Sequence, residues 1–268
     1  MSNHVSYNED VIDLHNHILP GLDDGAADME ETLAIARQFA SEGVVRVAAT
    51  PHANPSRPVP GQAARVQSLV AEVQVALGDA RVSLEVLSGN EVMLAPETPD
   101  LLQRGEILTL GGSRAVLVEC SFDQRPLYLE MTLFQLQVAG YQPILAHPER
   151  YSFVQRHPGS IEDLVRRGIV LQLNAGSLAG GYGPAAARTA RTLLMQGWYS
   201  TAASDRHHPG VERSLAALHD RLVRLANLDV ADLLLCHNPL RLLTDETPTP
   251  PDPLPAKQGS LFSRLFNR

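Results

Sequence analysis

Short apolar runs rich in β-branched residues alternate with longer amphipathic stretches along most of the chain. The runs favour β-strands and the stretches favour helices, so the sequence predicts a series of βα units. Seven strands are expected, over residues 11–17, 44–50, 82–87, 114–118, 142–146, 169–173 and 198–203. Such units with short connections build a mainly parallel sheet, which places the chain in the α/β class. Seven in one unbroken series favour a closed or nearly closed barrel without a second domain.

Helices are expected over residues 29–42, 62–77, 127–139, 161–167, 185–196, 211–226 and 230–243. Asp28 and Glu31 have the capping-box spacing that begins the first helix, and Gly43 is a stop signal at its end. Residues 244–256 are rich in proline and acidic side chains, a composition that buries too little apolar surface to fold. We therefore expect one folded domain over residues 1–243, followed by a disordered linker within residues 244–268.

The end of the chain carries a short amphipathic and basic pattern. Two apolar pairs, Leu261-Phe262 and Leu265-Phe266, are four residues apart and lie beside Arg264 and Arg268. On a helix these apolar side chains would share one face, which is typical of weak docking to a partner or to an anionic membrane surface. The alternative is a terminus without function.

Charge and cysteine content restrict the cellular compartments and the classes of binding partner that are expected for this chain. The net charge is −8 and no long basic run precedes the tail, which disfavours a nucleic-acid partner. The two cysteines, Cys120 and Cys236, give neither a disulfide framework nor zinc-finger spacing. Residues 1–10 lack the basic start and apolar core of a signal peptide, and no apolar run approaches membrane-spanning length. A cytoplasmic protein is expected.

The predicted strands end in side chains that bind metals. His15 and His17 are two residues apart on one strand and therefore point the same way. Clustered carboxylates repel one another unless cations neutralise them. Nitrogen and oxygen ligands without thiolate suit manganese, iron or zinc rather than calcium, so a multinuclear metal site is expected. Its candidate ligands are His15, His17, Asp24, His52, Glu91, Glu119, His147, Asp205 and His207.

These residues form motifs that resemble the polymerase and histidinol phosphatase (PHP) superfamily. The motifs are His15-Asn-His17, Thr50-Pro-His52, the strand-end Glu91 and Glu119, His147-Pro-Glu-Arg150 and Ser204-Asp-Arg-His207. The stretch Asp13-Leu-His-Asn-His-Ile-Leu-Pro-Gly-Leu-Asp-Asp-Gly25 looks like one branch of it, the bacterial manganese-dependent protein-tyrosine phosphatases of capsule and exopolysaccharide loci. The resemblance extends over roughly residues 11–243.

The resemblance implies a distorted (β/α)7 barrel with three divalent metal ions, with manganese favoured over iron or zinc. One ion would take His15, His17, Glu91 and Asp205. A second would share Glu91 and add Glu119 and His147, and the third would take Asp24, His52 and His207. The implied reaction is hydrolysis of protein phosphotyrosine by a metal-bound hydroxide. The implied substrate is a membrane-bound bacterial tyrosine kinase that controls polysaccharide export.

Arg150 matches the family's phosphate-binding arginine, and a planar guanidinium suits that bidentate task. The family's second arginine falls on Glu212 in this chain. Arg206 and Arg213 are its neighbours, and Arg213 would serve after a one-residue loop shift. Asn174, at another strand end, either contacts substrate or turns the chain.

Other functions remain as alternatives. One is a small-molecule phosphatase such as histidinol phosphatase, and another is a non-catalytic scaffold stabilised by metals. An exonuclease is disfavoured by the acidic balance. Cys120 and Arg125, like Cys236 and Arg241, have four residues between them, whereas the cysteine-phosphatase loop needs five. Four histidines lack strand-end placement and are expected at the surface or behind the ligands: His157, His208, His219 and His237.

Overall fold

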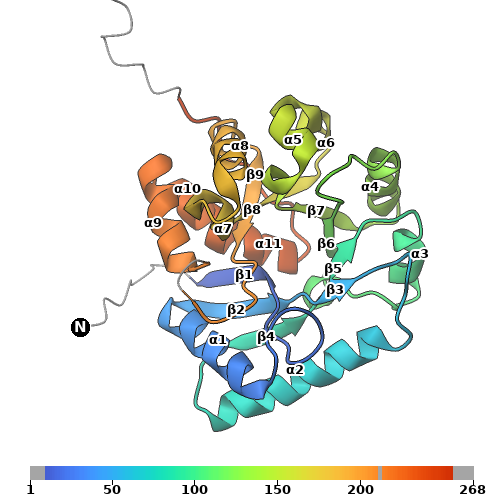
Figure 1. Cartoon of the computed structure of the whole chain (residues 1–268), viewed down its shortest axis with the longest axis vertical. Coiled ribbons are helices and arrows are strands. Elements are labelled where there is room, and N and C mark those ends of the chain that lie inside the picture. The colour runs from blue at the N-terminus through green and yellow to red at the C-terminus, as the bar shows by residue number, and fades with distance from the viewer. Residues whose placement is uncertain (1–9, 211–212, 256–268) are drawn as a thin grey trace, which may run out of the picture.

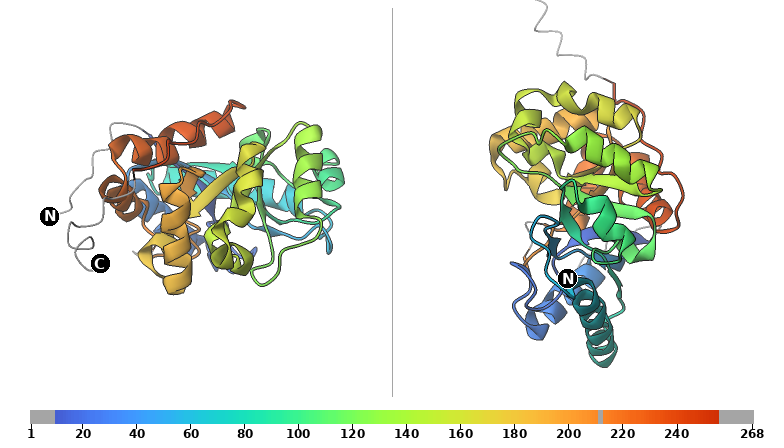
Figure 2. Two further views of the ribbon diagram at one scale, coloured as in Figure 1. Left: turned by 90° about the horizontal axis from the view of Figure 1, so that it is seen from above. Right: turned by 90° about the vertical axis from the view of Figure 1, so that its right-hand side faces the viewer.

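The computed structural model of the protein describes residues 10–210 and 213–255. Within these ranges every strand pairing is parallel, as the βα pattern predicts. The strands lie in the middle of the molecule and the helices surround them (Figures 1 and 2). The strands are β1 (Val11–Asn16), β2 (Val44–Ala49), β3 (His52–Ala53), β4 (Glu85–Ser88), β5 (Glu91–Met93), β6 (Ala115–Glu119), β7 (Gln142–Ala146), β8 (Val170–Asn174) and β9 (Tyr199–Ala203).

The strands form two sheets that are parts of one ring. One has the order β1-β2-β4 and the other the order β3-β5-β6-β7-β8-β9. Two of the expected strands, β2 and β4, are each followed after two residues by a further short strand, β3 and β5, that the sequence pattern did not predict. Pro51, between β2 and β3, has no N–H to donate. Gly89 lies between β4 and β5, and a Cβ on it would lie 2.8 Å from Leu110 Cδ2. The backbone therefore passes too close to Leu110 for a side chain at this position.

Backbone hydrogen bonds link the end of the first strand to the segment just after the last strand. The Asp205 N–H donates to the His15 carbonyl and the His17 N–H donates to the Arg206 carbonyl, both at 2.8 Å. The strand order is therefore that of a seven-stranded barrel whose hydrogen-bond ladder is interrupted. The expected α/β class is confirmed, and the distortion lies between β2 and β3 and between β4 and β5.

The longer helices agree with the amphipathic stretches. Asp28 caps α1 by accepting the Glu31 N–H, as the sequence predicts. The expected helix over residues 230–243 is instead α10, a π-helical turn and α11. The helices are α1 (Met29–Ser41), α2 (Gln62–Asp79), α3 (Thr98–Gln103), α4 (Leu129–Val138), α5 (Ser152–Arg156), α6 (Glu162–Arg166), α7 (Ala175–Ala179), α8 (Gly183–Met195), α9 (Leu215–Leu225), α10 (Leu228–Asp232) and α11 (Asn238–Leu243). Shorter turns are η1 (Leu110–Gly112), η2 (Pro148–Arg150), η3 (Pro158–Ile161) and the π-helical η4 (Leu233–His237).

Two apolar cores lie on the two sides of the strands. The larger joins the outward strand residues to the helices, and the smaller fills the barrel with side chains such as Leu14, Leu117 and Ile144. Leu110 and Leu242 belong to the smaller core and come from η1 and α11. Successive inward positions of a strand are two residues apart. On β8 the row that begins at Val170 therefore continues to Gln172 and Asn174, so its upper end is polar.

Residues 244–255 differ from the expected disordered linker. The Thr249 N–H donates to Asn238 Oδ1 at 3.0 Å, and the Leu254 N–H donates to the Met195 carbonyl at 2.9 Å. Leu254 also packs against the larger core. This extended segment thus finds backbone partners on the protein body, which its proline-rich composition alone did not indicate. The domain boundary at residue 243 stays a prediction.

The amphipathic pattern at residues 261–268 lies outside the described residues. In the part of the chain that the structure describes, no helix combines the length and apolarity needed to cross a membrane.

Candidate metal centre

Four buried side chains converge above the carboxyl ends of the strands. His15 Nε2 lies 3.2 Å from Glu91 Oε2 and 3.5 Å from Asp205 Oδ1. His17 Nε2 lies 3.5 Å and 3.6 Å from the same two oxygens. Ligands about 2.1 Å from one ion are about 3.0–3.5 Å from each other. The spacing of these four atoms therefore fits a shared cation.

The two histidines are held so that one ring nitrogen of each points into the cluster. His15 Nδ1 donates to Gln172 Oε1 at 2.9 Å, and His17 Nδ1 donates to Asp23 Oδ2 at 2.7 Å. Both Nε2 atoms are buried without a hydrogen bond. Metal-binding histidines are typically oriented in this way, by a hydrogen bond from the nitrogen that does not bind metal. Unsatisfied buried polar atoms are rare, and a cation would satisfy both.

Glu91 also contacts a second group of ligands. His147 Nε2 lies 2.8 Å from Glu91 Oε1, and His52 Nδ1 lies 3.1 Å from Glu91 Oε2. Glu119 Oε1 lies 3.4 Å from the same His52 nitrogen. Glu91 therefore adjoins the first group, the pair of His52 and Glu119, and His147. The His147 ring also lies close to His15 and Asp205.

A third group lies nearer the surface, around Asp24. Its Oδ1 is 3.3 Å from His207 Nε2 and 3.5 Å from His52 Nε2. His52 thus faces the third group with Nε2 and the second group with Nδ1. The structure brings together all nine candidate ligands, and it places His52 against two groups rather than one.

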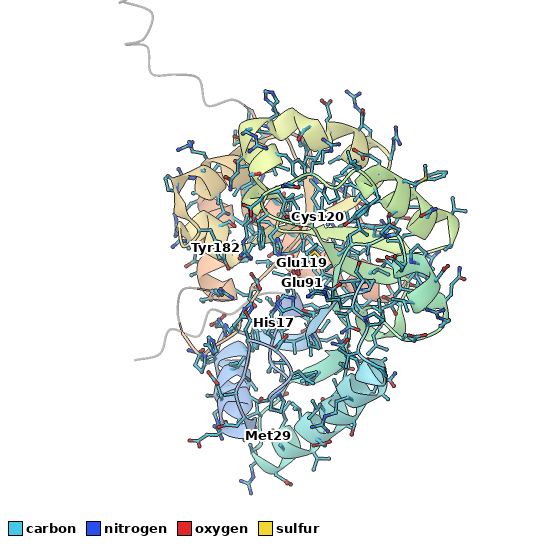
Figure 3. All side chains as sticks on the ribbon, turned by 45° about the vertical axis from the view of Figure 1, so that its right-hand side comes forward. His17, Met29, Glu91, Glu119, Cys120 and Tyr182 are labelled. Atoms are coloured by element: carbon cyan, nitrogen blue, oxygen red, sulfur yellow. The ribbon has the colours of Figure 1, made fainter. Side chains whose placement is uncertain are left out.

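The ligand groups open into a cavity of about 450 Å³, which Arg150, Arg213 and Phe122 also line. Figure 3 shows His17, Glu91 and Glu119 close together in the middle of the molecule, with Tyr182 to one side. The protein therefore has a concave site with histidines and carboxylates on its floor and two arginines, Arg150 and Arg213, on its rim.

Two residues of the site have strained backbones. His147 has φ 35° and Asp205 has φ 51°, in the left-handed region that side chains rarely adopt. Such a conformation costs about 1–3 kcal/mol and persists where the surroundings impose it. Both residues come within two positions of a strand end, and the left-handed turn keeps their side chains over the barrel.

Asp205 is oriented by three donors on one of its oxygens. Oδ2 accepts from Asn174 Nδ2 at 2.6 Å, from the Tyr182 hydroxyl at 3.1 Å and from Arg150 at 3.2 Å. Oδ1 is thereby left facing His15, His17 and His207. Asn174 thus orients a predicted ligand through this hydrogen bond.

The charges in the cluster shift several pKa values. Burial lowers the pKa of His15, but Glu91 and Asp205 raise it to about 9. Burial likewise opposes protonation of His52, whose pKa is raised to about 11 by Glu119 and Glu91. Burial raises the pKa of Asp205, and His15 then brings it down to about 2. Asp205 therefore stays ionised and is stabilised by positive charge nearby, which protons or metal ions can supply.

Of the three arginines considered from sequence, two reach the cavity. The Arg150 guanidinium lies between the Phe122 ring, 4.4 Å away, and the Tyr182 ring, 4.0 Å away. Arg213 contacts His207 and the Asp205 carbonyl. Arg206 is instead fully buried and pairs with Glu42 at 2.7 Å. Glu212 lies outside the described residues.

The motifs do not predict three residues that shape the site, Phe122, Tyr182 and Gln172, nor the orienting role of Asp23. The position of Gln172 can still be predicted from the sequence, because Gln172 lies two residues before Asn174 and therefore points to the same inward face of the strand. Phe122 and Tyr182 lie in connecting segments, where no periodic pattern predicts the direction in which a side chain points.

Among the described residues, the cysteines and the other histidines belong to none of the candidate ligand groups. Cys120 and Cys236 are both buried, and burial raises the pKa of the Cys120 thiol to about 12. A thiol with that pKa is a poor nucleophile at neutral pH. His208 lines the cavity edge and contacts Glu31, while His219 contacts Asp232.

The parallel α/β fold, with clustered histidines and carboxylates at the carboxyl ends of its strands, defines a barrel-like protein with a candidate metal centre. The family model for capsular polysaccharide synthesis proteins, CpsB/CapC, matches residues 11–244, and the chain belongs to that family. The resemblance to PHP-type tyrosine phosphatases of capsule loci is thereby confirmed.

Curated relatives and solved structures agree with this assignment. The chain is 31% identical to the tyrosine-protein phosphatase YwqE of Bacillus subtilis, over 94% of this chain and 99% of the relative. It is 26% identical to the tyrosine-protein phosphatase CpsB of Streptococcus pneumoniae, over 62% and 68% of the two chains.

Among solved structures, a chain from the study of YwqE and CpsB, described as metal-dependent tyrosine phosphatases, superposes with a TM-score of 0.81 at 30% identity. The match covers 92% of this chain and 100% of the other. A lactonase from Listeria monocytogenes shares the fold alone, with a TM-score of 0.54 at 13% identity over 87% and 94% of the chains.

Proposed function

We propose that this protein is a metal-dependent phosphomonoesterase that hydrolyses phosphotyrosine on protein. The observation that carries the proposal is the gathering of nine histidines and carboxylates at one cavity, which seven of them line together with Arg150. The names of the relatives support the same activity. A non-catalytic scaffold has no need of an arginine held between two aromatic rings at the cavity rim.

We further propose three divalent ions, with manganese as the native metal. The first would take His15, His17, Glu91 and Asp205. The second would take Glu91, Glu119 and His147, and the third Asp24, His52 and His207, with His52 also near the second. Bound ions of this kind supply Lewis acidity, which neutralises phosphate oxygens and lowers the pKa of water.

The protein's own groups bind and orient the phosphoryl group. Arg150 presents N–H donors to phosphate, and the rings of Phe122 and Tyr182 restrict its guanidinium to one direction. Arg213 lies 5.7 Å from the Tyr182 ring and supplies a second positive charge. Tyr182 stays neutral because burial and Asp205 raise its pKa to about 12, so its hydroxyl remains a donor.

Phosphotyrosine suits a site of this kind. The tyrosine phenolate has a pKa near 10 and leaves without a strong general acid. The exposed Phe122 ring at the cavity lining offers a flat apolar surface for the substrate's own ring. An aryl phosphate would therefore gain contacts that an alkyl phosphate would not.

The proposed substrate is a membrane-bound bacterial tyrosine kinase that controls polysaccharide export, met in the cytoplasm. The apolar and basic pattern of residues 261–268 would raise the local concentration of the enzyme near that kinase. Deleting residues 256–268 should leave the turnover of a free phosphopeptide unchanged and reduce co-sedimentation with kinase-containing membranes. Equal co-sedimentation would leave the terminus without that role.

One comparison tests the activity against its rivals. Purified protein with manganese should hydrolyse a phosphotyrosine peptide at least about tenfold more efficiently, in kcat/KM, than histidinol phosphate. The reverse order would identify a small-molecule phosphatase. Absence of turnover with both, in protein that holds its metals, would favour the scaffold.

A further inference from the structure

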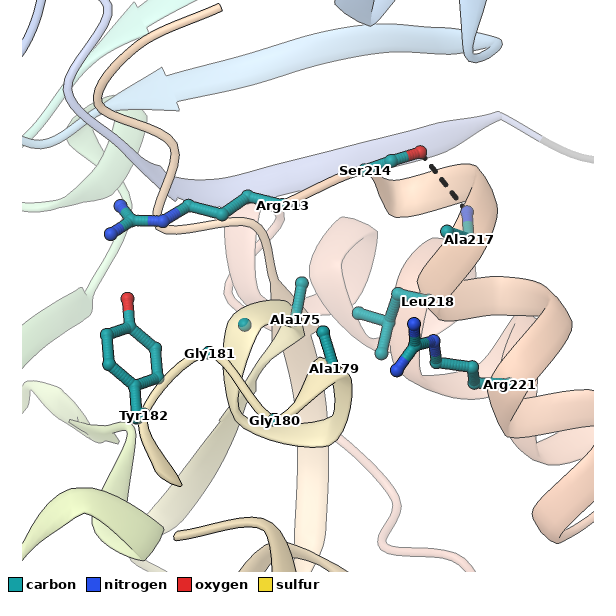
Figure 4. Close-up of a pocket in the computed structure, with 11 residues that line it drawn as sticks. Ala175, Ala179, Gly180, Gly181, Tyr182, Arg213, Ser214, Ala217, Leu218 and Arg221 are labelled. Atoms are coloured by element: carbon teal, nitrogen blue, oxygen red, sulfur yellow. Dashed lines mark hydrogen bonds between the residues drawn. The ribbon is translucent and has the colours of Figure 1, made fainter. Parts of the chain in front are cut away.

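A second cavity adjoins the metal cavity on the side of α7 and α9. Its volume is about 510 Å³, and Figure 4 shows the residues that line it. Arg213 lines both cavities. Tyr182 also lines the second cavity, and its hydroxyl reaches Asp205 in the first. A molecule bound over the metal ligands would therefore extend directly towards this α7–α9 pocket.

Small residues form the floor of the α7–α9 pocket. They are Ala175, Gly176, Ala179, Gly180 and Gly181. A Cβ on Gly176 would lie 2.8 Å from Tyr182 Cε2, so the absence of a side chain there allows the Tyr182 ring its position. The floor leaves room for a side chain that belongs to another molecule.

The lining is cationic although the whole chain has a net charge of −8. It contains two arginines, Arg213 and Arg221, and no carboxylate. Arg221 donates to the Leu178 carbonyl at 2.8 Å, which fixes its guanidinium beside the pocket. Within the described ranges, no carboxylate lies at salt-bridge distance from Arg221. Figure 4 shows Arg213 at one end of the pocket and Arg221 at the other.

We propose that the α7–α9 pocket binds an acidic side chain that flanks the phosphotyrosine of the protein substrate. The proposal rests on the proposed phosphatase function, since it concerns the residues next to the hydrolysed group. Arg221 pairs with the carboxylate of the flanking residue, while Arg213 faces the phosphoryl group. The first turn of α9, which begins after Ser214, adds the positive end of a helix dipole to the same wall.

The test is a set of phosphotyrosine peptides that carry Glu, Ala or Lys at each of the three positions on either side of the tyrosine. At one position or more, the wild-type protein should prefer Glu over Lys by about three- to tenfold in kcat/KM, as for a partly buried ion pair. Arg221→Ala should remove this preference, and Arg221→Glu should reverse it.

Arg224→Glu is the matched control, because Arg224 is exposed on the same helix and lies outside the pocket lining. It makes the same charge change and should retain the Glu preference. A reversal in Arg221→Glu cannot come from partial unfolding, because the Lys peptides are then used better than before.

The outcomes separate the pocket from the activity. Equal use of Glu, Ala and Lys peptides by an active wild-type protein overturns the pocket proposal and leaves the phosphatase function standing. A Glu preference that survives in Arg221→Glu also overturns it. Failure of the metal-loaded wild type to hydrolyse any of the peptides overturns both proposals.

Discussion

The deep half and the open half of the candidate metal centre are built differently. In the deep half, His15, His17, Glu91 and Asp205 are each at most 2% exposed. In the open half, the side chain of Asp24 is 70% exposed and that of His52 is 42% exposed. Both halves carry the same ligand types, so their difference lies in how firmly each ligand is held.

Hydrogen bonds hold the side chain of each deep ligand in a single orientation. Gln172 and Asp23 hold the two histidines, while Asn174 and Tyr182 hold Asp205. Asp24 instead lies on a loop, and no comparable donor holds it within the described ranges. Preorganised ligands bind metal more tightly than mobile ones. The deep half should therefore retain its ions while the open half exchanges them.

Glu91→Gln should give the largest effect, because Glu91 contacts both the first and the second group of ligands. Turnover of a phosphotyrosine peptide should fall by at least about a thousandfold, and added manganese should not restore it. Glu97→Gln, an exposed position nearby in sequence, is the control and should behave as wild type. Full metal content with full turnover in Glu91→Gln would refute the shared position.

Arg150→Ala should reduce kcat/KM by about a hundredfold through the loss of phosphate binding. Arg150 is not a proposed ligand, so metal content measured by atomic spectroscopy should stay at the wild-type level. Arg104→Ala, at the exposed end of α3 where Arg104 pairs with Glu106, is the matched control. The assignment fails if Arg150→Ala releases the metals or keeps wild-type kcat/KM.

Asp24→Asn should have a smaller effect that depends on metal concentration. With manganese limiting, turnover should drop by about tenfold, because one ligand of an exposed group loses its charge. Excess manganese should restore most of it, unlike in Glu91→Gln. A loss that no metal concentration repairs would mean that the open half is held as firmly as the deep half.

Cys120→Ala should change turnover by less than about twofold. The thiol is buried next to Glu119 and its pKa is raised to about 12 by burial and by that carboxylate. Thiol-modifying reagents should accordingly leave the native protein active at neutral pH. An inactive but folded Cys120→Ala variant with full metal content would point to cysteine chemistry instead.

The same contrast explains how much the sequence predicts. The deep ligands lie at or just beyond the ends of apolar runs, so strand periodicity and motif spacing are enough to place them near one another. His15 and His17 are the clearest case, since their two-residue spacing alone gives a shared direction. Glu91 is harder: it begins the separate short strand β5 rather than ending the expected third strand.

The rim of the site depends on loops and on long-range packing. Phe122 and Tyr182 approach Arg150 from segments about 60 residues apart in sequence. Their positions depend on local turns and on the absence of a side chain at Gly176, and strand and helix patterns predict neither. The sequence also does not predict that Arg206 is buried against Glu42. An arginine between two ligands in the sequence can point either into the cavity or into the core.

The central claim is that bound metal ions are required and that the deep half retains them longest. Its most direct test is a chelator titration that follows bound manganese per chain and phosphotyrosine-peptide turnover in the same samples. We predict stepwise release, with turnover lost as metal leaves and restored by added manganese. Undiminished turnover in protein shown to contain no metal would contradict the account.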